Sequence, residues 1–475
     1  MKTIYLFLTL FTSIIPMTSH THPKKPRIAV IGAGLAGLTT AYRLAQQGLD
    51  VHVYEAKDRV GGRILSAYLN DNVVELGGQN ILDGGEAHHT VQLIQEMGLE
   101  LEDYSRNFDF YYLDNDNLVY LHEIIRQKRW KAEDIYNQLL ELKKTCHTMQ
   151  EVITKLLADE NDPLAQRCKV LLAAYEGGTP DKLSVKYIET LYHILLGGLS
   201  STHQISDKKT LSYLIVKGGN SLLPQALAHK LGDKVHLNMP LKALTKNKSG
   251  SYLLTFDNHA SDIEADIVVL ALPCGVYHTI NFNNVIPDTR LQQLYKVGFG
   301  TTAKTIVPSY SNDYLVKTCA DNRVIVSYHK EMKSFIVYHT GQAGSFTPAT
   351  LPNLYQTNLK LIHKGWNPEF ISQETAVYAH DKPFVRYIHP VAYSWVQDPY
   401  IQGSYSYIAA GQEEVALQLE KYAGHHVRTL FAPVDGTLYF AGEHTTIMMD
   451  ILGTIEAACE SGDRTAAMIT STLED

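Results

Sequence analysis

The chain has 475 residues, of which 45% are hydrophobic, and a formal net charge of −8 at pH 7. This length and apolar content suffice for a large core and predict two domains. The negative charge argues against a nucleic-acid partner, because phosphate backbones favour basic surfaces. The five cysteines have no metal-ligand spacing, which favours buried free thiols over a disulfide framework; they are Cys146, Cys168, Cys274, Cys319 and Cys459.

The first residues have the pattern of a secretory signal peptide. Lys2 precedes an apolar run at residues 4–15, and Ser19 is a small residue suited to cleavage. The run is too short to span a bilayer. We therefore expect residues 1–19 to be a signal peptide and the protein to be exported, to the periplasm or as a secreted protein. An uncleaved amphiphilic anchor is the alternative, and peripheral membrane contact stays open.

The sequence RIAVIGAGLAGL predicts a buried strand, a glycine-rich turn and a helix. Gly32 permits the tight turn, Gly34 lets the backbone approach a pyrophosphate, and Gly37 lets the helix pack closely against the strand. A second predicted strand, LDVHVYE, ends in Glu55, whose carboxylate can accept hydrogen bonds from ribose hydroxyls. This order predicts dinucleotide binding, with the positive end of the helix dipole facing the phosphates. Glycines of an ordinary βα turn are the alternative.

A cationic turn, EAKDRVGGR, follows the second strand. Gly62 allows a sharp turn from which Arg63 can point back toward the diphosphate, and Lys57 is expected near the adenosine side of Glu55. A nicotinamide site rarely needs this second cationic element, so the turn favours a large, permanently held dinucleotide such as FAD. A solvated surface turn with ordinary ion pairs is the alternative.

The middle of the chain changes pattern twice. From about residue 120 to 200, apolar residues recur at helical spacing, as in WKAEDIYNQLLELKKTCHTMQEVITKLL. Strand patterns return near Val235 and in DIVVLALP, and residues 301–394 mix strands such as AKTIVPSY and NRVIVSYH with a helix near PNLYQTNLKLIH. Because dinucleotide-binding patterns occur in three separated pieces, we expect one discontinuous cofactor domain and a second domain built from two inserts.

The C-terminal sequence LYFAGEHT predicts a strand that ends at Gly442 and Glu443. The carboxylate can bind a polyol chain such as ribityl; a helix-capping acid is the alternative. The helix that follows Gly453 and Thr454 would aim its N-terminus at an electron-rich ring edge.

Together, IGAGLAGL…YEAKDRVGGR, ELGGQN, VKGGNSLLPQALA, SWVQDPYIQGSYS and FAGEHT…EAACESGDRTAA resemble the flavin-containing amine oxidases, the family of monoamine, polyamine and L-amino-acid oxidases. The resemblance covers almost the whole mature chain and is weakest at residues 100–210 and 310–390. It implies an α/β fold in which a discontinuous Rossmann-like FAD-binding domain is interleaved with an α+β substrate-binding domain containing a helical insert. The expected limits are 25–98, 211–300 and 395–475 for the FAD-binding domain, and 99–210 and 301–394 for the substrate domain.

The resemblance also implies a reaction and a set of site residues. Hydride passes from the carbon that bears a neutral amine to the flavin. The resulting imine hydrolyses to an aldehyde or ketone with release of ammonia or an amine. Dioxygen then reoxidises the flavin and is reduced to hydrogen peroxide. Lys304 matches the family lysine that holds a water and assists the reaction of oxygen, while Trp395 and Tyr405 match the aromatic wall beside the flavin. The implied FAD-binding residues are Gly32, Gly34, Leu35, Ala36, Gly37, Glu55, Lys57, Gly62, Arg63, Gly78, Gln79, Asn80, Val235, Trp395, Gly442, Glu443, Gly453, Thr454 and Ile455.

Three departures from the family pattern refine these expectations. Ser404 stands where monoamine oxidases place the cysteine that bonds to flavin, so we expect noncovalent FAD. Thr454 replaces the second tyrosine of the aromatic cage, which leaves the pocket open on one side. Asn80 replaces the arginine with which L-amino-acid oxidases clamp a carboxylate, and this favours amines over amino acids, although another arginine such as Arg386 could serve.

The adjacent histidines at 88–89 and 425–426 lack acidic or cysteine partners at metal-binding spacing, so no metal is expected. The expected function is FAD-dependent oxidation of a C–N bond in a small amine. The alternatives are an L-amino-acid oxidase, a desaturase-type relative acting on C–C bonds, and a flavin-binding interaction protein without activity. The sequence leaves the amine and the oligomeric state open.

Overall fold

The computed structural model describes residues 25–83, 87–103, 109–114, 117–159, 161–196, 212–310, 317–320, 323–329 and 332–474. The predicted signal peptide at 1–19 lies outside these residues, so its cleavage and the export of the protein stay predictions. Within the described ranges, no helix has the length and apolar character needed to cross a membrane.

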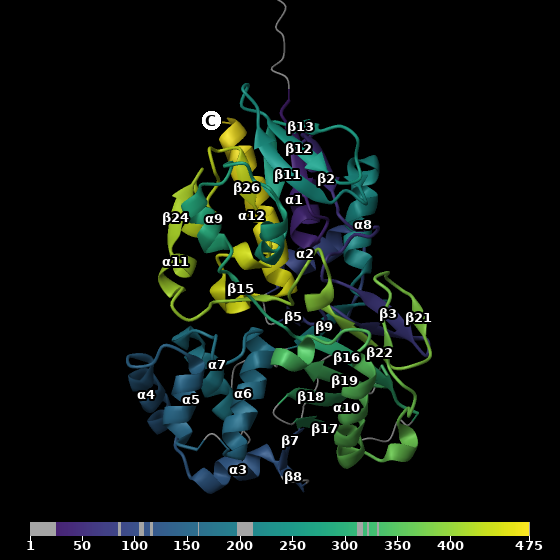
Figure 1. Ribbon diagram of the computed structural model, residues 1–475, viewed down its shortest axis with the longest axis vertical. Coiled ribbons are helices and arrows are strands. Elements are labelled where there is room, and N and C mark those ends of the chain that lie inside the picture. Colours follow the sequence, from purple (N-terminus) through teal and green to yellow (C-terminus); the bar gives the residue numbers. More distant parts are fainter. Residues whose placement is uncertain are drawn as a thin grey trace, which may run out of the picture.

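A five-stranded parallel sheet forms the core of the upper body in Figure 1. Its strands come from three separated parts of the chain, in the order β10 (Val235–His236), β2 (Asp50–Tyr54), β1 (Arg27–Ile31), β14 (Ile267–Leu270) and β26 (Leu438–Phe440). Successive residues of β1 alternate between two buried clusters, with Ile28 and Val30 in one and Ala29 and Ile31 in the other. Because both faces of the strand are buried, its sequence is an uninterrupted apolar run.

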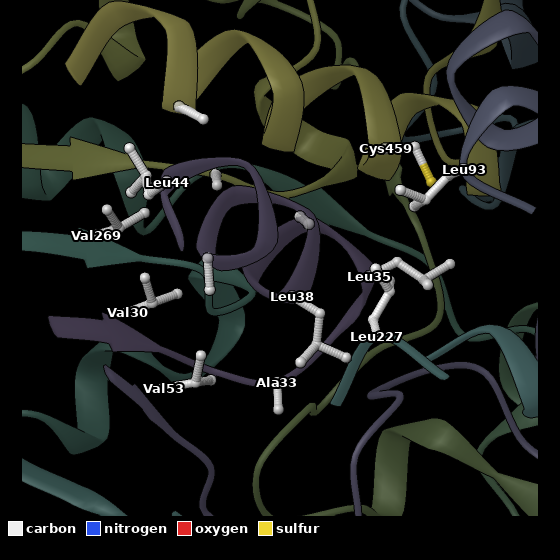
Figure 2. Packing of buried hydrophobic residues seen from close by; sticks show 14 of the residues in the cluster. Val30, Ala33, Leu35, Leu38, Leu44, Val53, Leu93, Leu227, Val269 and Cys459 are labelled. Carbon is white, nitrogen blue, oxygen red and sulfur yellow. The ribbon is translucent and has the colours of Figure 1, made fainter. Parts of the chain in front are cut away.

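Helices cover one face of this sheet. They are α1 (Leu35–Gln46), α2 (His88–Glu96), α8 (Leu222–Leu231) and α12 (Ile455–Glu474). Val30, Val53 and Val269 of the sheet belong to one buried cluster with Leu38 and Leu44 of α1 (Figure 2). The other face packs against an antiparallel sheet of β11 (Leu241–Lys246), β12 (Tyr252–Phe256) and β13 (Ile263–Ala265). The βαβ unit predicted from the glycine turn is therefore confirmed.

An eight-stranded sheet forms the lower right of Figure 1, with α10 (Leu351–Gly365) packed against one face. Its order is β20 (Val377–Tyr378), β22 (Val391–Ser394), β16 (Ala303–Pro308), β19 (Ser334–His339), β18 (Val324–His329), β17 (Lys317–Ala320), β7 (Asp109–Asp114) and β8 (Asn117–Tyr120). The predicted helical stretch forms a bundle at the lower left, made of α3 (Leu121–Lys128), α4 (Ala132–Lys143), α5 (Met149–Leu157), α6 (Pro163–Glu176) and α7 (Ile188–Leu196).

Several strand pairs join pieces of chain on opposite sides of the predicted domain limits. Strand β6 (Leu101–Asp103) pairs with β9 (Ser212–Val216), which also pairs with β5 (Ile81–Asp83). Strand β21 (Arg386–Tyr387) pairs with β3 (Ser66–Leu69), which pairs with β4 (Asn72–Glu75). The exact domain limits therefore stay a prediction. The remaining elements are α9 (Asp288–Leu294), α11 (Glu413–Leu417), the pair β15 (Gly298–Phe299) and β23 (Ser406–Tyr407), and the pair β24 (Leu419–Tyr422) and β25 (His425–Arg428).

The approach of α1 to β1 at Gly37 predicts a sharp stability effect. A Cβ atom at Gly37 would lie 2.1 Å from the carbonyl oxygen of Gly32, whereas one at Gly34 would meet nothing within 4 Å. We expect Gly37→Ala to destabilise the fold by about 3 kcal/mol, because helix and strand must move apart. Gly34→Ala is the matched control. Because Gly34 faces the predicted phosphate site, both variants are measured without bound dinucleotide, and there Gly34→Ala should leave the midpoint of thermal unfolding nearly unchanged. Equal midpoints for the two variants would contradict the packing role of Gly37.

Candidate active site

One cavity of about 790 Å³ joins the glycine turn after β1 to a face of the eight-stranded sheet. Its wall contains residues from the cationic turn, from the end of β26 and from strands β16, β18 and β19. Among the residues proposed from the sequence, those that line it are Gly32, Gly34, Leu35, Ala36, Glu55, Lys57, Gly62, Arg63, Gly78, Gln79, Asn80, Lys304, Trp395, Tyr405, Gly442, Glu443, Gly453, Thr454 and Ile455. The fold thus brings together residues that are more than 400 positions apart.

The end of the cavity near the parallel sheet is built around Glu55. Its carboxylate accepts hydrogen bonds from the backbone N–H groups of Ala33, at 2.7 Å, and Lys57, at 3.0 Å. Burial raises the pKa of Glu55, and these two hydrogen bonds oppose the rise. Open space lies in front of Gly34 at the start of α1, where unpaired N–H groups and the helix dipole favour an anion.

The cationic turn is tied to a distant segment of the chain. The Lys57 ammonium contacts the carboxylates of Asp398 and Asp381, the latter at 2.6 Å. The buried Arg59 guanidinium also binds Asp381, at 2.6 Å, and donates to backbone carbonyls of its own turn. The prediction that Lys57 lies near the adenosine side of Glu55 stays a prediction. Lys57 lines the cavity and its backbone N–H donates to Glu55, while its charge is neutralised by two acids more than 320 residues away in the chain.

Arg63 and Glu443 form the ion pair that connects the N-terminal turn to the C-terminal strand. The two side chains meet at 2.7 Å, and Arg63 also donates to the carbonyl of Ser404 at 2.6 Å. The Glu443 carboxylate accepts further hydrogen bonds from the N–H and hydroxyl of Ser406 and from the N–H of Gly453. Burial alone would raise the pKa of Glu443, but the Arg63 charge and these contacts hold it below its usual range. A contact to ribityl stays a prediction.

Lys304 of β16 points into the cavity and is almost fully buried. Its ammonium donates to the carbonyl oxygens of Glu75 (3.0 Å) and Gly77 (2.8 Å) and to Oε1 of Gln79 (2.9 Å). Burial lowers the pKa of Lys304 to about 8, and the negative charge of Glu75 opposes this shift. Burial also raises the pKa of Glu75 to about 7, against hydrogen bonds from Asn220 and Ser66. The site therefore holds a lysine that can exchange its proton near neutral pH.

Aromatic side chains form the wall next to Lys304. Trp395 donates its indole N–H to the carbonyl of Leu76 at 3.2 Å. The hydroxyl of Tyr405 meets that of Tyr338 at 3.0 Å and donates to the carbonyl of Ala174 in α6. The Tyr405 ring lies so close to Gly177 and Gly453 that a Cβ atom on either glycine would come within 3 Å of it. Tyr405 is thus held in one orientation, as a wall residue requires.

Three residues proposed from the sequence lie away from the cavity. Gly37 packs against the backbone of Gly32, and Val235 pairs with Val53 in the parallel sheet. Arg386, the proposed alternative carboxylate clamp, is a surface residue that pairs with Asp71 and lies over the ring of Tyr68. Arg63 is the only arginine among the described residues that line the cavity, and Glu443 already neutralises it.

Sequence reasoning missed four residues of the cavity environment. Glu75 adjusts the charge of Lys304, and Tyr338 holds Tyr405. Ser327 and His329 also line the cavity and are hydrogen bonded to each other. The strand sequence VIVSYH did contain a signal, because its two polar residues are two positions apart and so lie on the same face.

The family model for flavin containing amine oxidoreductase matches residues 35–308 and 386–470. The chain belongs to this family. It is therefore an FAD-dependent amine oxidoreductase with the α/β fold of its relatives. Residues 309–385, which carry strands β17 to β20 and α10, lie between the two matched segments.

The comparisons with individual proteins agree with this assignment. The chain is 26% identical to amine oxidase [flavin-containing] B of Bos taurus, over 93% of this chain and 85% of that protein. It is 23% identical to a probable flavin-containing monoamine oxidase A of Dictyostelium discoideum, over 94% and 98% of the two chains. Among solved structures, a wild-type putrescine oxidase bound to putrescine has a TM-score of 0.69 at 19% identity, over 94% of this chain and 99% of that one. A cyclohexylamine oxidase from Brevibacterium oxydans has a TM-score of 0.69 at 18% identity, over 95% and 100%.

The residues of the cavity fit FAD. The open space at Gly34 and the first turn of α1 suit a diphosphate, and Glu55 at the tip of β2 suits a ribose. The cavity continues from there, past the Arg63–Glu443 ion pair, to Lys304 and Trp395, which gives a path for a long dinucleotide ending in a flat ring. In this arrangement Gly34, Leu35 and Ala36 would hold the phosphates.

The buried Lys304 predicts a specific pH dependence of stability. In the unfolded chain a lysine keeps its proton up to pH 10.5, whereas folded Lys304 loses it above about pH 8. Between these values the unfolded chain binds more protons, so Lys304 makes folding more favourable as the pH rises. The midpoint of thermal unfolding of wild type, taken relative to that of Lys304→Met, should therefore rise between pH 8 and pH 10. Lys230→Met, at an exposed position of α8, is the control. A constant difference for Lys304→Met would contradict the lowered pKa.

Proposed function

We propose that this chain oxidises the C–N bond of a small amine and passes the electrons to dioxygen. The observation that carries the proposal is Lys304: a nearly buried ammonium on the cavity wall, held by three oxygen atoms between the dinucleotide-binding end and the sheet face. A cation in a dry pocket stabilises negative charge that develops on oxygen. Its lowered pKa also limits the repulsion that a bound amine would meet.

When bound, FAD would supply the redox chemistry, as acceptor of the hydride from the nitrogen-bearing carbon and as donor of two electrons to dioxygen, which with two protons gives hydrogen peroxide. The iminium product loses a proton, and water hydrolyses the imine to an aldehyde or ketone with release of ammonia or an amine. The chain's own contribution is orientation and exclusion of water. Trp395 and Tyr405, both fixed by hydrogen bonds, form the wall against which an uncharged amine is placed.

The charges of the cavity support an amine rather than an amino acid. Arg63, the only arginine among the described lining residues, is already paired with Glu443, so it cannot clamp a substrate carboxylate. Related folds include a putrescine oxidase and a cyclohexylamine oxidase. An L-amino-acid substrate is the second candidate, and the test below separates the two.

Two further features belong to the proposal. FAD is held noncovalently, because Ser404 lines the cavity and the described lining residues include no cysteine. The proposal that the protein is exported, to the periplasm or out of the cell, is based on the pattern of residues 1–19 alone.

The function is tested by a peroxide-release screen of the purified, FAD-loaded protein against monoamines, diamines, polyamines and L-amino acids. We expect peroxide with one or more amines and none with amino acids, because Arg63, the only arginine among the described lining residues, is already paired with Glu443. Reduction of the flavin absorbance by the same amine without oxygen is the companion measurement. Flavin that stays oxidised with every compound would overturn the oxidase function in favour of a binding role.

The role of Lys304 is tested separately from the amine. Flavin is reduced chemically in wild type, Lys304→Met and the surface control Lys230→Met, and its absorbance is followed after mixing with oxygen. We expect Lys304→Met to slow reoxidation about 100-fold, the usual effect of removing one stabilising group. The FAD released on denaturation should be the same in all three proteins. Wild-type reoxidation in Lys304→Met would remove the assignment.

A further inference from the structure

One face of the eight-stranded sheet forms the cavity wall opposite the parallel sheet. In the paired register, Lys304 of β16 stands beside Tyr338 of β19, which stands beside Ile325 of β18. Paired residues of neighbouring strands point to the same face, and all three line the cavity. Ile336 and Ser327 lie two residues from Tyr338 and Ile325 in their own strands, so they point to the same face, and both also line the cavity.

Ser327 and His329 form a polar pair on this face. The Ser327 hydroxyl and Nε2 of His329 are 2.8 Å apart. The imidazole is buried, whereas Ser327 is partly exposed on the cavity wall. The histidine can therefore orient a hydroxyl group that a molecule in the cavity can reach. A hydroxyl both donates and accepts hydrogen bonds, so it suits a neutral partner.

The pair lies well away from the reacting end of the cavity. From Lys304, Ser327 is two strands across and one two-residue step along. With strands about 4.8 Å apart and a rise of about 3.3 Å per residue, the two Cα positions are about 12 Å apart. This separation suits a substrate whose amine reacts near Lys304 and whose other end reaches Ser327.

The charges on this wall indicate what the far end of the substrate carries. Acidic residues line the cavity at Glu55, Glu443 and Asp257. Glu55 and Glu443 are engaged by the backbone and by Arg63, and Asp257, at the end of β12, belongs to the dinucleotide side. The described lining residues of β16, β18 and β19 include no carboxylate and no arginine. A second ammonium would therefore be buried there without a carboxylate partner, and a carboxylate would require the buried imidazole of His329 to carry a charge; both are costly.

We propose that Ser327, positioned by His329, binds a neutral hydrogen-bonding group such as a hydroxyl at the end of the amine remote from the reacting carbon. The substrate class is a hydroxylated monoamine, aliphatic or aromatic. The inference rests on the proposed function, because it requires the amine to react beside Lys304. Both residues lie at 309–385, between the segments that match the family model, so they are features of this chain rather than of the matched family segments.

The chain offers a matched control in the same sheet. Thr305 of β16 also places its hydroxyl against an imidazole, 2.9 Å from Nε2 of His339. Thr305 is the neighbour of Lys304 in the strand and so points to the opposite face, and it is absent from the cavity wall. Thr305→Val removes a hydroxyl from an equivalent pair without touching the cavity.

The test compares substrates that differ by one hydroxyl: 4-hydroxyphenethylamine against phenethylamine, and ω-amino alcohols of increasing length against the corresponding alkylamines. For the pair of substrates with the highest kcat/KM, wild type should favour the hydroxylated amine over its counterpart by about tenfold in kcat/KM. Ser327→Ala should abolish this preference by lowering kcat/KM for the hydroxylated amine to the value of its counterpart, and His329→Phe should reduce the preference. Thr305→Val should keep it.

A binding measurement without turnover completes the design. Amines whose nitrogen-bearing carbon carries two methyl groups have no hydrogen to transfer, and their binding is followed through the flavin spectrum. The hydroxylated compound should bind about tenfold more tightly than its counterpart in wild type, and equally in Ser327→Ala. Ser327→Cys, which keeps the size of the side chain, replaces Ser327→Ala if that variant does not fold.

The outcomes separate the two proposals. If no amine reduces the flavin, the proposed function fails. If amines react but wild type shows no preference for a hydroxyl, or Ser327 variants keep the preference, only this inference is overturned. A Ser327-dependent preference for diamines or amino acids would also overturn it, because the bound group would then be charged.

Discussion

The ion pair between Arg63 and Glu443 is the contact that most of the site depends on. Glu443 is buried, and a buried carboxylate requires charged and hydrogen-bonding partners. Those partners come from the cationic turn, from Ser406 in β23 and from Gly453 before α12. One acid thus fixes the N-terminal turn, a strand and the start of the last helix around a single cavity. Both residues of the ion pair line the cavity.

Burial has a different effect on Arg63 and Lys304, two of the cationic residues that line the cavity. Arg63 is paired with Glu443 and takes part in holding the fold together. Lys304 is surrounded mainly by neutral oxygen atoms, so desolvation lowers its pKa into a range where it can gain or lose a proton. The carboxylate of Glu75 limits this shift without replacing the neutral contacts. The paired Arg63 therefore stabilises the structure, whereas the environment of Lys304 is suited to chemistry.

The cavity also divides between two kinds of sequence. Most of its dinucleotide side, including Glu55 at a strand tip and Glu443, comes from segments that the family model matches, and the glycine turn at Gly32 and Gly34 directly precedes the first of them. Its sheet side includes Ser327, His329 and Tyr338, which lie between the matched segments. In our proposals, the redox chemistry and the choice of substrate are carried by different strands, which meet at Lys304 and the neighbouring aromatic residues. This division explains how one fold can serve different amines.

Local patterns in the sequence determined the first βαβ unit, the buried parallel strands and the helical stretch that became α3 to α7. These features follow from short-range rules: a glycine turn needs particular residues at fixed spacing, and burial on both faces requires a continuous apolar run. Most of the proposed site residues line the cavity, and the sequence could point to them because the motifs that carry them are local. Only the tertiary structure decided where the charges go. It paired Lys57 with Asp398, placed Arg386 at the surface beside Asp71 and brought Glu75 to Lys304. The partners of a buried charge are chosen by packing among segments hundreds of residues apart, and no spacing rule along the chain records that choice.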